Sequence, residues 1–128
     1  MLIPTPVANL GVFQKAYDLS LEIHHQSLEI PQANQYGSLA DQMRRASKSI
    51  CANLVEGLGK NQSPKDKRRF VNTAIGSCDE VKLWLMYARD LGYIDQGKVE
   101  SLGKRYSEVG RMLYGLLQSI QSQIEAKT

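Results

Sequence analysis

Apolar residues recur along this chain at intervals of three or four positions, which is the spacing of one helix face, and no stretch alternates with the period of a strand. The first periodic stretch spans residues 12–29 and the second spans residues 38–56. Their stripes consist of Phe13, Ala16, Ser20, Ile23 and Ser27, and of Leu39, Met43, Ala46, Ile50 and Leu54. Both stretches are predicted to form amphipathic helices.

Two further helices are predicted in the second half of the chain. Ser63 and Pro64, followed by Asp66, form an N-cap, a first helical position and a carboxylate that can reach back to the N–H of the capping residue. The core stripe of this third helix is Phe70, Ala74, Ser77, Val81, Trp84, Leu85 and Ala88. The last stretch has the 3,4 repeat of a bundle seam, at Val99, Leu102, Tyr106, Val109, Leu113, Leu116 and Ile120.

Glycines and prolines separate these stretches, with Pro31 after the first, Gly57 and Gly59 after the second, and Gly92 after the third. Connections of about four to nine residues favour neighbouring antiparallel helices. We therefore predict an all-α fold, an up-and-down antiparallel four-helix bundle forming a single domain over residues 1–128. Residues 1–10 are expected to be an N-terminal extension, and residues 121–128 a frayed C-terminus.

The third predicted helix has apolar residues on two sides, more than the core of one bundle needs. Its outer side holds Ile75, Gly76, Leu83, Met86 and Tyr87. One face of a helix in a four-helix bundle points outward, so apolar residues there indicate a contact with another subunit. We predict a homo-oligomer with this interface.

The composition excludes several protein classes. A mean hydropathy of −0.35, with 23% charged residues and no long apolar run, excludes both a membrane protein and a wholly disordered chain. The N-terminus lacks the pattern of a secretory signal, so a cytoplasmic location is expected. Cys51 and Cys78 have no metal-site spacing and are interpreted as small buried residues.

Basic residues are concentrated in the middle of the chain. Between Arg44 and Arg69 lie eight basic and two acidic residues, a net charge of +6 within a chain whose total is +3. Such asymmetry favours an anion-binding face over uniform solubilising charge. The residues assigned to nucleic-acid binding are Arg44, Lys48, Lys60, Lys65, Arg68 and Arg69.

A polar line borders the core stripe of the second predicted helix. It contains Arg45, Ser49, Asn53 and Glu56, and Glu80 of the third helix is the expected partner of Arg45. A catalytic carboxylate is one interpretation. A structural hydrogen-bond network that fixes helix register and closes a turn at Gly57 is favoured, because buried polar groups need partners.

The strongest candidate for enzyme chemistry is the pair Glu22 and His25, whose spacing matches half of a di-iron carboxylate site. Such a site needs a second pair, and His24 and His25 are the only histidines in the chain. Phosphate-binding loop patterns are also missing. We therefore predict a protein that is not an enzyme, with no metal and no cofactor.

The run from Arg44 to Gly57 resembles the RRA-x-x-SI-x-x-N-[IL]-x-EG signature of the four-helix-bundle proteins encoded in 23S rRNA intervening sequences. Residues 13–19, 74–77 with Glu80, and 91–94 resemble other elements of that family, and the resemblance covers about residues 12–120. It implies a homopentameric ring, no established enzymatic activity and an association with RNA or ribosomes that is poorly defined. A related fold serves as the accessory protein of diversity-generating retroelements, where it partners a reverse transcriptase.

Two functional hypotheses follow. The first is a non-enzymatic module that binds RNA or another nucleic acid weakly through the basic segment. The second is a protein-interaction scaffold, or an accessory subunit of a nucleic-acid-processing partner such as a reverse transcriptase.

Overall fold

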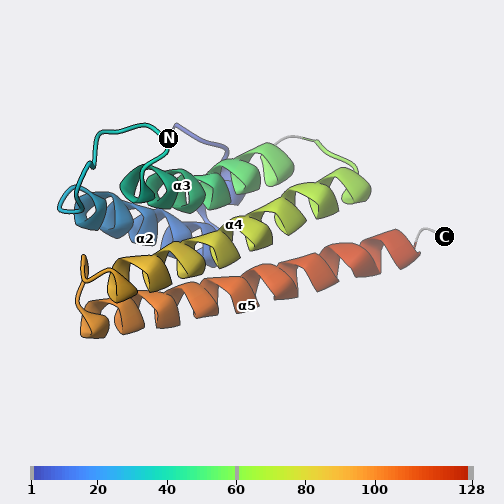
Figure 1. The fold of residues 1–128 in the computed structure, drawn as a ribbon. Helices are drawn as coiled ribbons and strands as arrows, with labels where there is room; N and C mark the ends of the chain where they lie inside the picture. The colour runs from blue at the N-terminus through green and yellow to red at the C-terminus, as the bar shows by residue number, and fades with distance from the viewer. Residues whose placement is uncertain (1, 60, 127–128) are drawn as a thin grey trace.

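The computed structural model describes residues 2–59 and 61–126, which form five helices. They are α1 (Thr5–Ala8), α2 (Gly11–Ser27), α3 (Leu39–Leu58), α4 (Pro64–Asp90) and α5 (Gln96–Ala126) (Figure 1). No strand occurs in this part of the chain. The prediction of an all-α single domain is confirmed.

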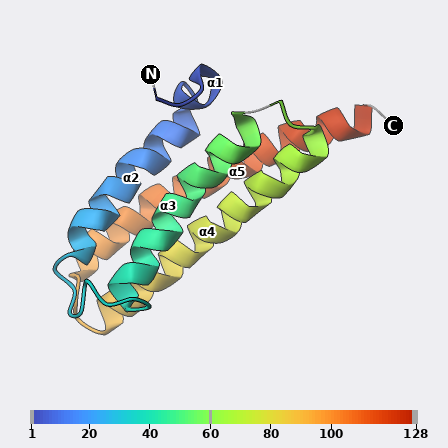
Figure 2. The same cartoon turned by 90° about the horizontal axis from the view of Figure 1, so that it is seen from above.

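The four long helices run alternately up and down and pack side by side (Figure 2). Helices α3 and α5 each contact both α2 and α4, so α2 and α4 are diagonal to each other. The α3–α4 pair has the most extensive contact of all the helix pairs. This pair holds most of the residues predicted to be functional.

The predicted stripes form the core with few exceptions. Every stripe position of α2 is buried, and Ile50, Leu85 and Tyr106 are among the largest side chains with no exposed surface. Four stripe residues lie only partly buried at the edge, namely Leu39, Phe70, Trp84 and Leu116. Val71, the next residue after Phe70, is buried instead, and Ile120 is buried near the far end of α5.

Both chain ends differ from the prediction. Residues 1–10 are more than an extension, because α1 lies within them and its Val7 is fully buried against the core. At the other end, α5 continues as a helix to Ala126 instead of fraying after residue 120. The end of α5 projects past the other helices (Figure 1), and Gln121 near this end accepts a hydrogen bond from Arg68 of α4.

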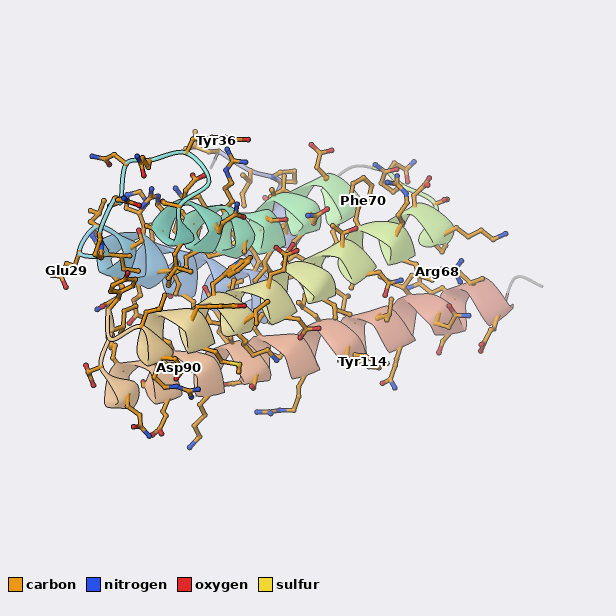
Figure 3. All side chains as sticks on the ribbon, viewed as in Figure 1. Glu29, Tyr36, Arg68, Phe70, Asp90 and Tyr114 are labelled. Carbon is orange, nitrogen blue, oxygen red and sulfur yellow. The ribbon has the colours of Figure 1, made fainter. Side chains whose placement is uncertain are left out.

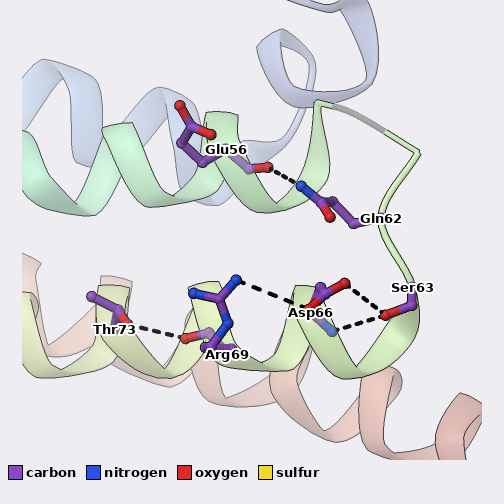
Figure 4. A network of polar contacts seen from close by, with 6 residues as sticks. All are labelled: Glu56, Gln62, Ser63, Asp66, Arg69 and Thr73. Carbon is purple, nitrogen blue, oxygen red and sulfur yellow. Dashed lines mark hydrogen bonds and ion pairs between the residues drawn. The ribbon is translucent and has the colours of Figure 1, made fainter.

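The predicted start of α4 is confirmed, with a change in one contact. Ser63 Oγ accepts a hydrogen bond of 3.2 Å from the Asp66 N–H, as an N-cap does (Figure 4). The Asp66 carboxylate accepts from the Ser63 hydroxyl at 3.0 Å, instead of from the backbone N–H of the cap. Ser38 caps α3 in the same way, through the Asp41 N–H at 3.2 Å.

Gly57 does not close a turn, contrary to the sequence interpretation. It lies inside α3, and the residue that caps the helix is Gly59. A Cβ added at Gly57 would lie 2.5 Å from Cβ of Phe70, far inside van der Waals contact. Gly57 therefore permits a close approach of α4 to α3.

Helix α4 has an exposed apolar face, at the residues predicted for a subunit interface. Leu83, Met86 and Tyr87 are about half exposed in the single chain, and a side chain added at Gly76 would meet open space. Ile75 differs, because it is partly buried against the core of its own bundle. In the described part of the chain, every helix is too short or too polar to cross a membrane.

Candidate nucleic-acid interface

Arg44, which the sequence assigns to nucleic-acid binding, makes hydrogen bonds within the bundle. Its Nη1 donates to Ser27 Oγ at 2.7 Å, and its Nη2 donates to the Ala33 carbonyl. Ser27 is fully buried and donates in turn to the His24 carbonyl at 2.7 Å. Arg44 thus connects α3 to the end of α2 and to the segment that follows it. The periodicity correctly placed this side chain off the core stripe but carried no information about that segment.

Lys48 is exposed and lies against the imidazole of His24. Its Nζ is 3.2 Å from His24 Nδ1, and because an ammonium only donates, His24 accepts as a neutral ring. Partial burial, together with the charges of Lys48 and Arg44, lowers the pKa of His24. Lys48 remains a cation at the surface, so it keeps its place in the candidate interface.

The basic residues of α4 differ in how they are held. Lys65 is exposed in the first turn. Arg69 is exposed as well, with Nη2 3.9 Å from Asp66 Oδ1 (Figure 4). Its guanidinium lies 4.4 Å from the centre of the Phe70 ring. Arg68 is partly buried and donates to Gln121 Oε1 of α5 at 3.0 Å, so it connects the two helices. Lys60 lies outside the described residues.

These cations form two groups instead of one surface. Because α3 and α4 are antiparallel, the start of α4 lies beside the end of α3 (Figure 2). Lys48 is ten residues before the last residue of α3, which corresponds to about 15 Å along the helix. A phosphate chain that contacts both groups must therefore follow the length of the α3–α4 pair.

The polar line of α3 is confirmed at its centre and corrected at its ends. Ser49 Oγ lies 2.8 Å from Ser77 Oγ of α4, and Asn53 Nδ2 donates to the Ser49 carbonyl at 2.8 Å and to its hydroxyl at 3.1 Å. Ser77, which the sequence placed in the core stripe, is therefore part of the network. The family-like segments of α3 and α4 meet at this point.

Arg45 does not pair with Glu80, which is exposed on α4. Its Nε lies 3.2 Å from Asp41 Oδ2 on its own helix, and its guanidinium stacks 4.4 Å from the centre of the Tyr36 ring. Glu56 is also exposed, and its carbonyl accepts from Gln62 Nε2 at 3.3 Å (Figure 4). These two glutamates are not the buried carboxylates that a catalytic site would use. The contact between Arg45 and Tyr36 was not predicted from the sequence. The only sequence feature that points to it is a single tyrosine within the predicted loop between the first two helices.

Glu22 and the two cysteines are further titratable residues that the sequence singles out. Glu22 accepts from Arg105 at 2.5 and 2.9 Å and lies 3.6 Å from Lys98 Nζ, and these contacts hold the pKa of its carboxyl below the usual value. No group of three or more metal-binding side chains occurs among the residues described. Burial raises the pKa of Cys51 to about 12 and that of Cys78 to about 11, so both thiols stay protonated.

Comparisons with known proteins identify a similar fold and a family. One solved structure, of a protein of unknown function from the S23 ribosomal protein family of Bacteroides thetaiotaomicron, superposes with a TM-score of 0.75. The match covers 84% of this chain and 95% of that one at 20% sequence identity, so it shows the fold alone. Comparison with curated proteins gave no match. The family model of the 23S rRNA-intervening sequence proteins matches residues 8–115, and the chain therefore belongs to this family.

Proposed function

We propose that this protein is a non-enzymatic oligomer that binds RNA or another nucleic acid weakly through the exposed cations of the α3–α4 pair. The observation that carries the proposal is the net charge of +6 between Arg44 and Arg69, with Lys48, Lys65 and Arg69 exposed. Lys65 and Arg69 flank the first turn of α4, where the positive end of the helix dipole also favours a phosphate. Repetition of weak contacts around an oligomer gives useful avidity.

A salt titration tests this proposal. Labelled RNA should bind the wild-type protein at about 50 mM salt, and the slope of log affinity against log salt should be about 0.7–0.9 per neutralised phosphate. Lys65→Glu/Arg69→Glu should weaken binding and flatten the slope. Arg68 is left unchanged in this variant because of its contact with Gln121.

The matched control is Lys104→Glu/Arg111→Glu, which makes the same charge change at exposed positions of α5. If the control weakens binding as much as the α4 variant, the interaction is only nonspecific attraction to positive charge. If the wild type does not bind, the proposal fails. The interaction-scaffold hypothesis, including the accessory role to a reverse transcriptase, then takes its place.

The oligomer proposed here uses the exposed face of α4 at Gly76, Leu83, Met86 and Tyr87, and a ring of five subunits is the preferred assembly from the family resemblance. Light scattering after gel filtration should give about five times the 14.3 kDa mass of one chain. Leu83→Asp/Met86→Asp should reduce that mass without unfolding the bundle, because both side chains are half exposed in the single chain. A monomeric wild type at micromolar concentration would contradict the oligomer.

A further inference from the structure

Tyr36 stands out among the aromatic residues because almost nothing of its own chain covers it. It lies in the segment between α2 and α3, at the edge of the molecule beside α3 (Figure 3), and 83% of its surface is exposed. One face of its ring is occupied by the Arg45 guanidinium, 4.4 Å from the ring centre. An exposure this high leaves the opposite face of the ring open.

The ring is held in place although it is not buried. Asp41 Oδ2 lies 3.2 Å from Arg45 Nε and also accepts from the Gly37 N–H at 2.8 Å. Gly37 has a φ of 77°, a conformation that side chains disfavour, and it turns the chain directly after Tyr36. The arginine that stacks on the ring and the backbone that follows the ring are therefore bound to the same carboxylate. The Tyr36 ring and the Arg45 guanidinium stacked on it, called the Tyr36 platform below, are therefore held in position without a ligand.

A second arginine–aromatic pair shows what distinguishes Tyr36. Arg69 stacks on Phe70 at the same distance of 4.4 Å. Phe70 is only partly exposed, however, because its Cβ packs against Gly57 of α3. The Phe70 ring belongs to the contact between the helices, whereas the Tyr36 ring makes no comparable contribution to the bundle.

We propose that the open face of Tyr36 stacks against one unpaired base of a single-stranded nucleic acid. Base–aromatic stacking needs an accessible, ordered ring and tolerates any base, and an adjacent guanidinium strengthens the platform. Asp41 offsets the charge of Arg45, so the Tyr36 ring with its stacked guanidinium contacts the base instead of a phosphate. Lys48 lies one helical turn after Arg45 on α3 and is available for the phosphate. Bases inside a duplex are stacked on each other, so the platform favours unpaired strands.

This inference rests on the proposed nucleic-acid binding. Two oligonucleotide probes distinguish base stacking on Tyr36 from binding of the phosphates. The first is a labelled oligouridylate of about ten nucleotides, and the second is an abasic oligomer with the same number of phosphates. The abasic oligomer measures the phosphate contribution alone. The wild-type protein should bind the oligouridylate roughly 5- to 100-fold more tightly than the abasic oligomer.

Three variants assign that difference to the ring. Tyr36→Ala should bind both probes equally, with the affinity that the wild type has for the abasic oligomer, and Tyr36→Phe should keep the preference for bases. Tyr114→Ala is the matched control, because Tyr114 is also exposed, at 57%, but lies on α5 away from the α2–α3 segment (Figure 3). This control should behave as the wild type does.

The outcomes are distinct. Equal binding of both probes by the wild type, or a Tyr36→Ala variant that keeps the base preference, overturns the stacking site and leaves the phosphate interface intact. Failure of the wild type to bind either probe overturns both proposals. Loss of an associated polypeptide in Tyr36→Ala, with unchanged oligonucleotide binding, would assign the exposed ring to a protein partner and also overturn the stacking site.

Discussion

The two ends of the α3–α4 pair are packed differently, although the same two helices form both. At the end of α3, Gly57 lets Phe70 approach so closely that no other side chain fits between them. At the start of α3, the helices leave a groove of about 390 Å³ lined by Gly37, Leu39, Gln42, Trp84, Tyr87 and Leu91. The contrast teaches that one small residue decides where this pair is tight, whereas larger side chains at the opposite end keep the two helices from closing completely.

The two ends also use their basic residues differently. At the open end, Arg44 binds the end of α2 and the following segment, and Arg45 supports Tyr36. At the tight end, Lys65 and Arg69 are exposed around a capped helix start. Two arginines thus give structural support at the open end, where Lys48 is the exposed cation, whereas Lys65 and Arg69 are both exposed at the tight end.

The largest expected effect is at the tight end. Gly57→Ala should lower the free energy of unfolding by about 3 kcal/mol, because the added Cβ meets a Cβ that is fixed to the backbone of α4. Denaturant melts measure this loss. Gly115→Ala is the control, since its added Cβ meets open space and alanine is favoured in a helix by about 1 kcal/mol. A Gly57→Ala variant as stable as the wild type would contradict the close contact.

The second effect separates the two kinds of basic residue. Arg44→Ala should cost about 2 kcal/mol of stability, because two charge-assisted hydrogen bonds are lost and buried Ser27 loses a partner. Lys65→Ala should change stability by less than about 0.5 kcal/mol and weaken nucleic-acid binding instead. Denaturant melts and nucleic-acid binding assays on both variants test whether Arg44 mainly affects stability and Lys65 mainly affects binding. Reversed outcomes would show that the two ends have been assigned the wrong way round.

The sequence predicted the helices and most of the core because both depend on local periodicity. The stripe of α2, the seam of α5 and the cap at Ser63 follow from spacing alone, and all are observed. The missed helix α1 is a single turn, and its stability comes from burying Val7 against distant residues. Four residues are too few to show a helical period.

The candidate site was harder to predict because it depends on partners that are distant in the sequence or in irregular segments. Arg44 points off the core stripe as expected, but its partners come from the end of α2 and the segment after it. Glycine commonly ends helices, so the sequence predicts a turn at Gly57. Glycine is required at this position because Phe70 of α4 leaves no room for a side chain, and this contact is visible only once the two helices are packed together.

A third, smaller effect lies midway between the ends. Asn53→Ala should cost about 1 kcal/mol, because the Asn53 amide donates to both the carbonyl and the hydroxyl of Ser49, which in turn contacts Ser77. Ser77→Ala should cost a similar amount, and the double variant should cost less than the sum since one network is lost once. Additive losses in thermal or denaturant melts would contradict a shared network.

The smallest effect is a pH dependence at the open end. Burial, followed by the charges of Lys48, Arg44 and His25, lowers the pKa of His24 from 6.5, so the unfolded chain binds its proton at a higher pH than the folded chain does. This contribution to stability is present above pH 6.5 and is lost as the pH falls below it.

Protonation of His24 also removes the acceptor that Lys48 uses. The melting temperature should therefore be lower at about pH 5.5 than at about pH 7, a range in which Glu22 stays ionised because its pKa is lowered from 4.5. His24→Gln should abolish most of this difference, and Lys48→Gln should reduce it by removing the nearest positive charge. His25→Gln should have a smaller effect, since His25 contributes least to the shift. If the His24→Gln variant keeps the full pH dependence, another group at this end of the bundle is responsible.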